Sequence, residues 1–439
     1  MPRRSFLLGT LLLPGLMSAR HAIGAASRAK SQGLAHCILG DSELSEVLDR
    51  AKSLLKSGLN AGDGYGEVWI RDLNTFIELS LQVNEAGPIR DALLNFFRFQ
   101  GASGDIVDGF IPQAKAGVGY KYRKSELAPS FLAHKNTVET DQESSLVQAV
   151  AKYCRVTGDQ SLLDETVAGI TVRERLGRAM EYLIRDRMEP SRQLLWGATT
   201  VDWGDVQPEH EWGVELDEHS HRSIDIYDNA MWIVALDELA SLPGQTRVAA
   251  KRWGRLRDTT RAQVRRHLWD AKRRKFVPHL YLEGSPFPTE FDEQAVWYHG
   301  GTAVAIEGGV LRRTEIKASL DSMRDNVRRA GASSIGLTVY PVYPDGFFKN
   351  KGMRAWSYQN GGDWCWFGGR MVQQLIRYGW VEEAYTELKP MVSRVLKHNG
   401  FFEWWTRTNE PRGSGKFRGS AGVLGRAIEM LREWATARV

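Results

Sequence analysis

The stretch DNAMWIVALDEL (228–239) is followed, after a short Leu-Pro-Gly segment, by TRVAAKRWGRLRDTTRAQVRRHLWD (246–270), and the two stretches differ in how their apolar and charged residues are distributed. The first segment is apolar on nearly every side of a helix, as a fully buried helix is. The second also has helical periodicity, but one of its faces is heavily charged, which is typical of a helix between core and solvent. The two segments predict neighbouring helices, one buried and one at the surface.

The same alternation runs along the whole chain. Segments with helical periodicity fall at 43–57, 72–86, 88–100, 140–157, 161–187, 225–241, 245–269, 290–306, 312–330, 359–378, 381–398 and 418–437. They form six consecutive pairs, and the second helix of each pair begins near Asp72, Asp141, Tyr227, Asp292, Gln359 and Gly419. A repeated helical hairpin of this kind indicates a closed or stacked array. We therefore expect an all-α (α/α)6 toroid over residues 43–439, with residues 27–42 as an N-terminal extension.

Composition excludes several classes of function. The formal net charge is +5, and the basic residues form no stripe of the kind that binds nucleic acid. Runs of 18 apolar residues are absent from the sequence, so we expect no membrane span. The three cysteines and ten histidines make no metal-ligand spacing, and we expect neither a metal nor a cofactor. The oligomeric state leaves no signal in the sequence.

The first 26 residues have the three parts of an export signal. A basic start with Arg3 and Arg4 precedes an apolar run through Leu13, and small residues follow around Ala25. The Arg3-Arg4 pair before Ser-Phe-Leu resembles a bacterial twin-arginine signal, which implies a periplasmic or secreted protein. Cleavage after Ala26 would lower the formal charge to +2, because it removes three arginines and no acidic residue.

Acidic and aromatic residues gather in the segments before the buried helices. Examples are GYGEVWIRD (64–72), DGFIPQ (108–113), VETDQES (138–144), WGATTVDWGDVQPEHEW (196–212), WSYQNGGDWCWFGG (356–369) and GFFEWW (400–405). Asp141, Asp228 and Asp292 are explained equally well as helix N-caps. Capping does not explain aromatic rings beside acids in one loop after another. Ring faces for stacking and carboxylates for hydroxyl groups are what a carbohydrate site needs, so we expect a carbohydrate substrate.

Two motifs carry a resemblance to a known superfamily. Trp-Ile-Arg-Asp (69–72) opens the first buried helix, and YQNGGDWCWFGG (358–369) precedes the fifth. With the six-hairpin plan they resemble the six-hairpin glycosidases, which include glucoamylases, the amylo-1,6-glucosidase part of glycogen debranching enzymes, processing α-glucosidases and trehalases. Cys365 stands where these families often have proline. The resemblance extends over roughly residues 43–437.

The resemblance implies an exported inverting glycoside hydrolase that cleaves an α-linked oligo- or polysaccharide with two carboxylates. The acid is expected in the loop between the helices of the third pair, which holds both Asp202 and Asp205, and the choice between them stays open. The base is expected just before the last helix, where Glu403 stands, with Arg407 and Lys416 as nearby donors that could keep it ionised. Inversion requires room for water, and the two carboxyl groups of such enzymes lie roughly 6.5–9.5 Å apart.

Further residues are expected to bind the sugar in the same subsite. These are Trp69, Arg71, Asp72, Asp141, Trp203, Gln359, Asn360, Asp363, Trp364 and Trp404. Arg71 and Asp72 resemble the pair that grips sugar hydroxyls in these glycosidases, although a capped salt bridge is the alternative.

Two other functions fit the same fold. A glycoside phosphorylase would need phosphate donors, and Arg407, Arg412, Lys416 and Arg418 are clustered in the sequence. The DWGD segment at 202–205 is also similar to a stretch of disaccharide phosphorylases. A non-catalytic carbohydrate-binding barrel would have lost its acid or base, and this chain has candidates for both.

Overall fold

The computed structural model describes residues 29–117 and 121–439, and the predicted export signal at 1–26 lies outside them. Residues 29–40 are helical and precede twelve further helices that form the six expected pairs. The first helices of the pairs are α2 (Ser42–Leu55), α4 (Ala86–Arg98), α6 (Val172–Asp186), α8 (Arg247–His267), α10 (Arg313–Ala330) and α12 (Val381–Lys397). The second are α3 (Ile70–Ser80), α5 (Gln142–Thr157), α7 (Ile226–Ser241), α9 (His299–Glu307), α11 (Cys365–Arg377) and α13 (Arg418–Thr436).

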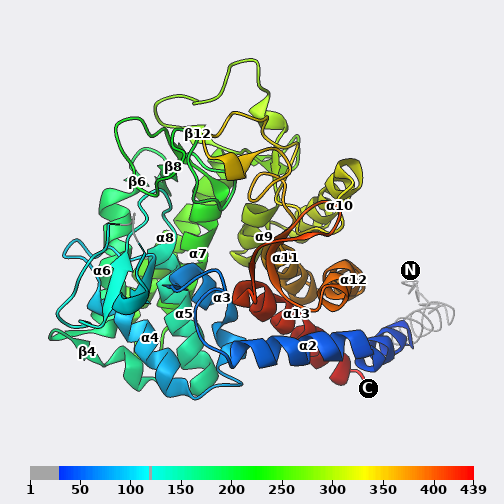
Figure 1. Ribbon diagram of the computed structural model, residues 1–439, viewed down its shortest axis with the longest axis horizontal. Coiled ribbons are helices and arrows are strands. Elements are labelled where there is room, and N and C mark those ends of the chain that lie inside the picture. Colours follow the sequence, from blue (N-terminus) through cyan, green and yellow to red (C-terminus); the bar gives the residue numbers. More distant parts are fainter. Residues whose placement is uncertain (1–28, 118–120) are drawn as a thin grey trace, which may run out of the picture.

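The second helices form a closed inner ring. Each packs against the next, from α3 through α5, α7, α9 and α11 to α13, and α13 packs back against α3. The first helices lie outside; Figure 1 shows α2, α10 and α12 at the periphery, with α9, α11 and α13 inside them. The predicted (α/α)6 toroid is thereby confirmed.

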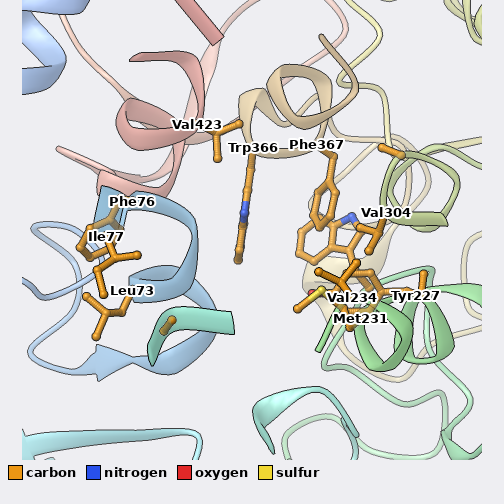
Figure 2. Packing of buried hydrophobic residues seen from close by; sticks show 14 of the residues in the cluster. Leu73, Phe76, Ile77, Tyr227, Met231, Val234, Val304, Trp366, Phe367 and Val423 are labelled. Carbon is orange, nitrogen blue, oxygen red and sulfur yellow. The ribbon is translucent and has the colours of Figure 1, made fainter. Parts of the chain in front are cut away.

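Apolar side chains of the inner helices fill the ring. Figure 2 shows Leu73 and Phe76 of α3 on one side of Trp366, with Phe367, Tyr227 and other α7 side chains on the other. These side chains are almost completely buried. Full burial of one large apolar side chain is worth about 1.5–3 kcal/mol, so the buried side chains of the ring contribute strongly to the stability of the domain.

The loops between the helices contain short antiparallel strands. Two three-stranded sheets have the orders β1–β2–β3 (Val68–Trp69, Gly109–Pro112, Phe131–His134) and β12–β9–β8 (Leu280–Tyr281, Arg222–Ile224, Gly197–Ala198). Hairpins are formed by β4 (Thr166–Val167) with β5 (Ile170–Thr171), β6 (Met188–Glu189) with β7 (Leu194–Leu195), and β10 (Trp269–Asp270) with β11 (Lys275–Phe276). The remaining pairs are β13 (Trp297–Tyr298) with β14 (Val339–Tyr340), and β15 (Phe402–Trp405) with β16 (Pro411–Gly415).

Three predicted helices begin later than expected. The segment predicted from 161 contains a short 3-10 turn and the hairpin β4–β5 before α6 starts at Val172. The segment predicted from 290 is a 3-10 turn and strand β13, and α9 begins only at His299. Helix α11 begins at Cys365 rather than near Gln359. In the first two cases antiparallel pairing takes up backbone groups that a helix would otherwise use.

The predicted N-caps are not observed. Asp225, three residues before Asp228, caps α7 by accepting the backbone N–H of Asp228. Asp141 occupies the N-cap position of α5, but its side chain makes no capping hydrogen bond. Asp292 precedes a 3-10 turn, also without a capping bond. The carboxylates of Asp141 and Asp228 are buried in the ring instead, where Asp141 meets Arg71.

Basic side chains cluster at one end of the toroid. Lys152, Arg155, Arg377 and Arg426 lie in the inner helices and line a cavity of about 370 Å³ with several acidic residues. Arg155 and Arg377 lie in the last turns of α5 and α11, where a cation offsets the negative end of the helix dipole. Of the helices the structure describes, none is long and apolar enough to cross a membrane.

Candidate active site

A cavity of about 410 Å³ opens at the end of the toroid where the inner helices begin. Its volume lies in the range of small-molecule binding sites. The lining comes from five of the six loops that lead into inner helices, so residues far apart in the sequence meet there. It consists of Ala61, Tyr65, Trp69, Arg71, Asp72, Asp108, His134, Asn136, Glu139, Trp203, Asp205, Val206, His210, Glu211, Trp212, Gly213, Val214, Asn350, Gly352, Tyr358, Gln359, Trp364, Trp366, Glu403 and Phe417.

Glu403 lies on β15 and is 4% exposed. Its Oε1 accepts a hydrogen bond from the Tyr65 hydroxyl at 2.9 Å, and its Oε2 accepts one from the Ser414 backbone N–H at 2.8 Å. Burial raises the pKa of Glu403, while these two donors lower it and the charge of Asp205 raises it. Both carboxylate oxygens are therefore oriented by fixed donors inside a largely apolar wall.

The β15–β16 hairpin fits closely around this carboxylate. Gly413 has φ of +70°, and a Cβ at that position would lie 2.4 Å from Oε2 of Glu403. Only glycine combines that backbone conformation with the required space. The hairpin sequence therefore provides both the glutamate and the room for it.

Asp205 and Asp202 occupy different environments. Asp205 is half-buried, lines the cavity and accepts a hydrogen bond from Gln359 Nε2 at 2.7 Å. Asp202 does not line that cavity and is 2% exposed. Its two oxygens accept the backbone N–H groups of Gly300 and Gly301, at 2.7 and 2.8 Å, at the start of α9. Asp202 therefore anchors the loop 196–212 to a helix N-terminus.

The approach of Asp202 to α9 depends on the two glycines. A Cβ on Gly300 would lie 2.8 Å from Oδ2 of Asp202, and one on Gly301 would lie 2.7 Å from Oδ1. Burial raises the pKa of Asp202, and the N–H groups of Gly301 and Gly300 lower it. The contact with Asp202 thus explains why α9, as observed, has two glycines near its beginning.

Arg71 and Asp72 open α3 and both line the cavity. Arg71 Nε lies 2.8 Å from Asp141 Oδ2, its Nη2 contacts Glu139, and its Nη1 donates to the Trp203 carbonyl at 3.2 Å. Asp141 is completely buried and also accepts the Tyr227 hydroxyl, so it orients Arg71 and does not itself line the cavity.

Asp72 is a strongly perturbed carboxyl of the cavity wall. Burial raises its pKa to about 8, the charge of Arg71 lowers it, and the charges of Glu403 and Asp108 raise it. Its Oδ1 is buried without a hydrogen-bond partner. A buried polar atom without a partner is costly, and this cost adds to the burial that disfavours the charged form of Asp72.

Aromatic rings form much of the remaining wall. Trp203 stacks on Phe367 with ring centroids 4.6 Å apart, and the Trp364 ring meets Trp203 edge-on at 4.5 Å. Trp69 and Trp366 also line the cavity, and the indole of Trp212 is 85% exposed at its wall. Flat apolar faces of this kind suit the faces of sugar rings.

Three further predicted residues do not line the cavity. Asn360 is completely buried and bonds the backbone of Tyr343 and Met353. Asp363 is 1% exposed and pairs with Arg394 at 2.7 Å. Trp404 packs beside Tyr358, with ring centroids 6.4 Å apart. Asn360 and Asp363 instead hold the loop that carries Gln359 and Trp364 to the cavity.

The predicted donors to Glu403 are not observed. Arg407 donates to the Ala330 carbonyl at 3.0 Å and lies over the Trp356 ring, and Lys416 is not among the cavity-lining residues. Their places are taken by the Tyr65 hydroxyl and the Ser414 N–H. The Ser414 N–H comes from the same hairpin as the glutamate, whereas the Tyr65 hydroxyl comes from a loop far away in the sequence.

Several residues of the lining were not singled out by the sequence. Tyr65, Asp108, Glu139 and Tyr358 all lie on it. Each belongs to one of the loops whose aromatic and acidic composition pointed to a site, so the signal was in the loop and not in the single residue. In the two described ranges of the chain, no group of three or more His, Cys, Asp or Glu side chains could hold a metal ion.

Comparison with known proteins gives matches in structure alone. Neither a protein-family model nor a curated protein sequence matches the chain. The GH63 mannosylglycerate hydrolase of Thermus thermophilus in complex with glucose matches with a TM-score of 0.60 and 15% identity, over 88% of this chain and 99% of that one. The same enzyme with Tris and D-glycerate gives a TM-score of 0.59 and 17% identity, over 88% and 99% of the two chains.

A rhamnosidase from Klebsiella oxytoca with rhamnose bound also matches. Its TM-score is 0.57 at 13% identity, over 89% of this chain and 64% of that one. These neighbours belong to the six-hairpin glycosidases with the (α/α)6 toroid. At such low identity the likeness establishes the fold, which this chain shares over most of its length.

Proposed function

We propose that the protein is an inverting glycoside hydrolase that acts on an α-linked oligo- or polysaccharide, with Asp205 as acid and Glu403 as base. One observation carries the proposal: these two carboxyl groups, from the loop 196–212 and from β15, share one aromatic-walled cavity. The fold shared with glycoside hydrolases supports the same reaction class. Fold alone would leave the chemistry open, so the proposal rests on the pair of carboxyl groups.

The reaction needs two proton transfers at opposite faces of the sugar. Asp205 gives its proton to the glycosidic oxygen as the bond from that oxygen to the anomeric carbon breaks. A water molecule attacks the anomeric carbon from the opposite face, and Glu403 takes a proton from that water. The product has the inverted anomeric configuration, and proton exchange with solvent restores both carboxyl groups.

The surroundings of the two groups fit these roles. The Tyr65 hydroxyl and the Ser414 N–H stabilise the ionised form of Glu403 against the effect of burial. Gln359 holds one oxygen of Asp205 and leaves the other for a proton directed at the substrate. Arg71 and Asp72, at the start of α3, are then the residues that grip hydroxyl groups of the reacting sugar.

The decisive experiment is a screen of aryl glycosides and oligosaccharides, with product anomers followed by NMR. We expect inversion, and a loss of at least about two orders of magnitude in kcat for Glu403→Gln and for Asp205→Asn. Glu410→Gln is the matched control, because Glu410 is an exposed glutamate of the same hairpin. A retained anomer, or full activity of Glu403→Gln, would refute the mechanism.

The alternative functions lose support from the same geometry. The four basic residues that favoured a phosphorylase do not line the cavity; Arg418, for example, bonds Asn60 and Ser57. A non-catalytic barrel is disfavoured because both carboxyl groups are present in one cavity. Strict dependence of cleavage on phosphate would restore the phosphorylase hypothesis.

Export belongs to the proposal as well. The Arg3-Arg4 signal and its apolar run support a periplasmic or secreted location. Fractionation of bacteria that produce the full-length chain should find the wild type outside the cytoplasm. Arg3→Lys with Arg4→Lys should keep it inside, and export of that double variant would contradict the twin-arginine route.

A further inference from the structure

We infer that the cavity accepts neutral glycosides and rejects substrates that carry a carboxylate, in the sugar or in the aglycone. The inference rests on the proposed function and narrows its substrate class. It comes from the distribution of charge in the cavity wall. Six of the lining residues are acidic: Asp72, Asp108, Glu139, Asp205, Glu211 and Glu403. Among the described residues of that lining, Arg71 is the single arginine and lysine is absent.

Arg71 has little capacity left for a substrate anion. Its Nε and Nη2 bond Asp141, Nη2 also contacts Glu139, and Nη1 donates to the Trp203 carbonyl. Two carboxylates thus face one guanidinium, and protein groups occupy four of its five N–H donors, which leaves one N–H on Nη1 for a substrate hydroxyl group. A substrate carboxylate could therefore pair with both terminal nitrogens of Arg71 only by displacing a protein carboxylate inside a buried site, where an unpaired charge is costly.

The two histidines of the wall are also paired with acids. His210 Nε2 lies 3.1 Å from Asp217 Oδ2, and His134 Nδ1 lies 3.8 Å from Asp108 Oδ2. Each imidazole therefore already faces a protein carboxylate. The wall offers no cation without a carboxylate partner among the residues the structure describes.

The carboxyl groups already disfavour one another's negative charge. The pKa values of Asp72 and Glu139 are raised by burial first, and Asp108 and Asp205 contribute to both shifts. An additional carboxylate would add to this repulsion. Hydroxyl groups avoid it, because they can donate hydrogen bonds to the acids and accept them from protonated ones. The chemistry of the wall is therefore that of a polyol receptor.

A matched pair of substrates tests the inference in catalysis. Hexosylglycerol and hexosylglycerate have the same skeleton and differ by a hydroxymethyl group against a carboxylate. We expect kcat/KM for the glycerol compound to exceed that for the glycerate compound by at least about 100-fold, in whichever sugar series is cleaved. Equal rates, or faster cleavage of the glycerate compound, would overturn the inference and leave the proposed function intact.

Reversal of one acidic charge in the wall tests whether the wall's negative charge causes the preference for the neutral substrate. Glu211→Lys, in the wall, should reduce the ratio of the two kcat/KM values at least about tenfold. Glu218→Lys is the matched control, because Glu218 is an exposed glutamate between Glu211 and β9 that does not line the cavity. An unchanged ratio in Glu211→Lys, or an equal change in the control, would contradict the electrostatic origin.

Equilibrium binding provides a readout that needs no turnover. Calorimetry with glucose, mannose and rhamnose should detect binding, and glucuronate and mannuronate should bind at least about 100-fold more weakly. A protein that binds the neutral sugars but cleaves no glycoside would refute the proposed function and support this inference. Preferred binding of the uronates, or binding of neither group, would overturn it.

Discussion

The phenolic hydroxyl of Tyr65 donates a hydrogen bond to Glu403 across 2.9 Å and joins residues 338 positions apart in the chain. Tyr65 belongs to the loop that leads into α3, and Glu403 to the hairpin before α13. The contact is thus made where α13 packs against α3 and closes the ring. The orientation of the proposed base depends on closure of the toroid.

Tyr65→Phe should move the acidic limb of the pH–activity profile to higher pH. The Tyr65 hydroxyl stabilises ionised Glu403 and lowers its pKa, so its loss raises that pKa. A base with a higher pKa is ionised only at higher pH. A hydrogen bond to a charged group is worth about 1.5 kcal/mol, which corresponds to a shift of about one pH unit in kcat/KM.

The control for that shift is Tyr385→Phe. Tyr385 donates to Asp41 at 2.7 Å, which is a similar tyrosine–carboxylate bond away from the cavity. Its removal should change stability without moving the profile. An unchanged acidic limb in Tyr65→Phe would show that another group titrates there.

Asp202 and Asp205 should give opposite results when each is changed to asparagine. Asp202→Asn turns an amide N–H toward the N–H of Gly300 or Gly301, and one buried bond is lost. We expect it to lower the free energy of unfolding by about 1–3 kcal/mol. Asp205→Asn should leave stability within about 1 kcal/mol and lower kcat at least about 100-fold.

Urea denaturation and kinetics of the folded fraction separate the two effects. The assignment of the acid would be reversed if Asp202→Asn abolished activity while Asp205→Asn retained it. A large loss of stability in Asp205→Asn would instead indicate that its bond to Gln359 is structural.

The helical layers could be predicted because their signal is local. The apolar residues of α7 and the charged face of α8 lie within single segments, so the composition of each segment indicates whether its helix is buried or at the surface. The late start of α9 could not be predicted in this way. It depends on pairing of Trp297 with Tyr340, whose segments are separated by the whole of α9 and α10.

The same difference between local and distant signals applies to the site. The loops that form it were predicted, since acids and aromatic rings cluster in each of them. The roles of single residues were not, because they depend on distant partners. Asp363 forms an ion pair with Arg394, and Asn360 bonds the backbone of Tyr343. Asp202 accepts the backbone N–H groups of Gly300 and Gly301. A sequence motif does not distinguish such a buried polar residue from one that faces a substrate.

Gly413→Ala should impair catalysis more than folding. The new methyl group would meet Oε2 and Cβ of Glu403, at 2.4 and 2.8 Å, and displace the carboxylate. We expect kcat to fall at least about tenfold, since small misplacements of a catalytic group are costly. Gly331→Ala is the control, because Gly331 has a φ of +63°, similar to the +70° of Gly413, but has open space where the methyl group would be added. Gly331→Ala should lose about 1 kcal/mol of stability, similar to the loss in Gly413→Ala, and its activity should be unchanged.

Equal activities of the two alanine variants would mean that Glu403 tolerates displacement. Such a result would weaken its assignment as the base. Circular dichroism of both variants, before and after the assay, excludes unfolding as the cause of a difference.

Asp72→Asn should stabilise the protein at alkaline pH while it abolishes activity. The folded pKa of Asp72 is about 8, against an ordinary value of 3.8. A carboxyl group with a raised folded pKa stabilises the fold fully below about pH 3.8, and this contribution is lost as pH rises toward 8. Between pH 5 and 8 the loss is on the order of 4 kcal/mol. Asparagine does not titrate, so the difference in unfolding free energy between variant and wild type should grow in favour of the variant over that interval. Urea denaturation of both proteins at pH 5, 6.5 and 8 measures it. A difference independent of pH would mean that Asp72 is ionised throughout, and that Arg71 compensates its charge completely.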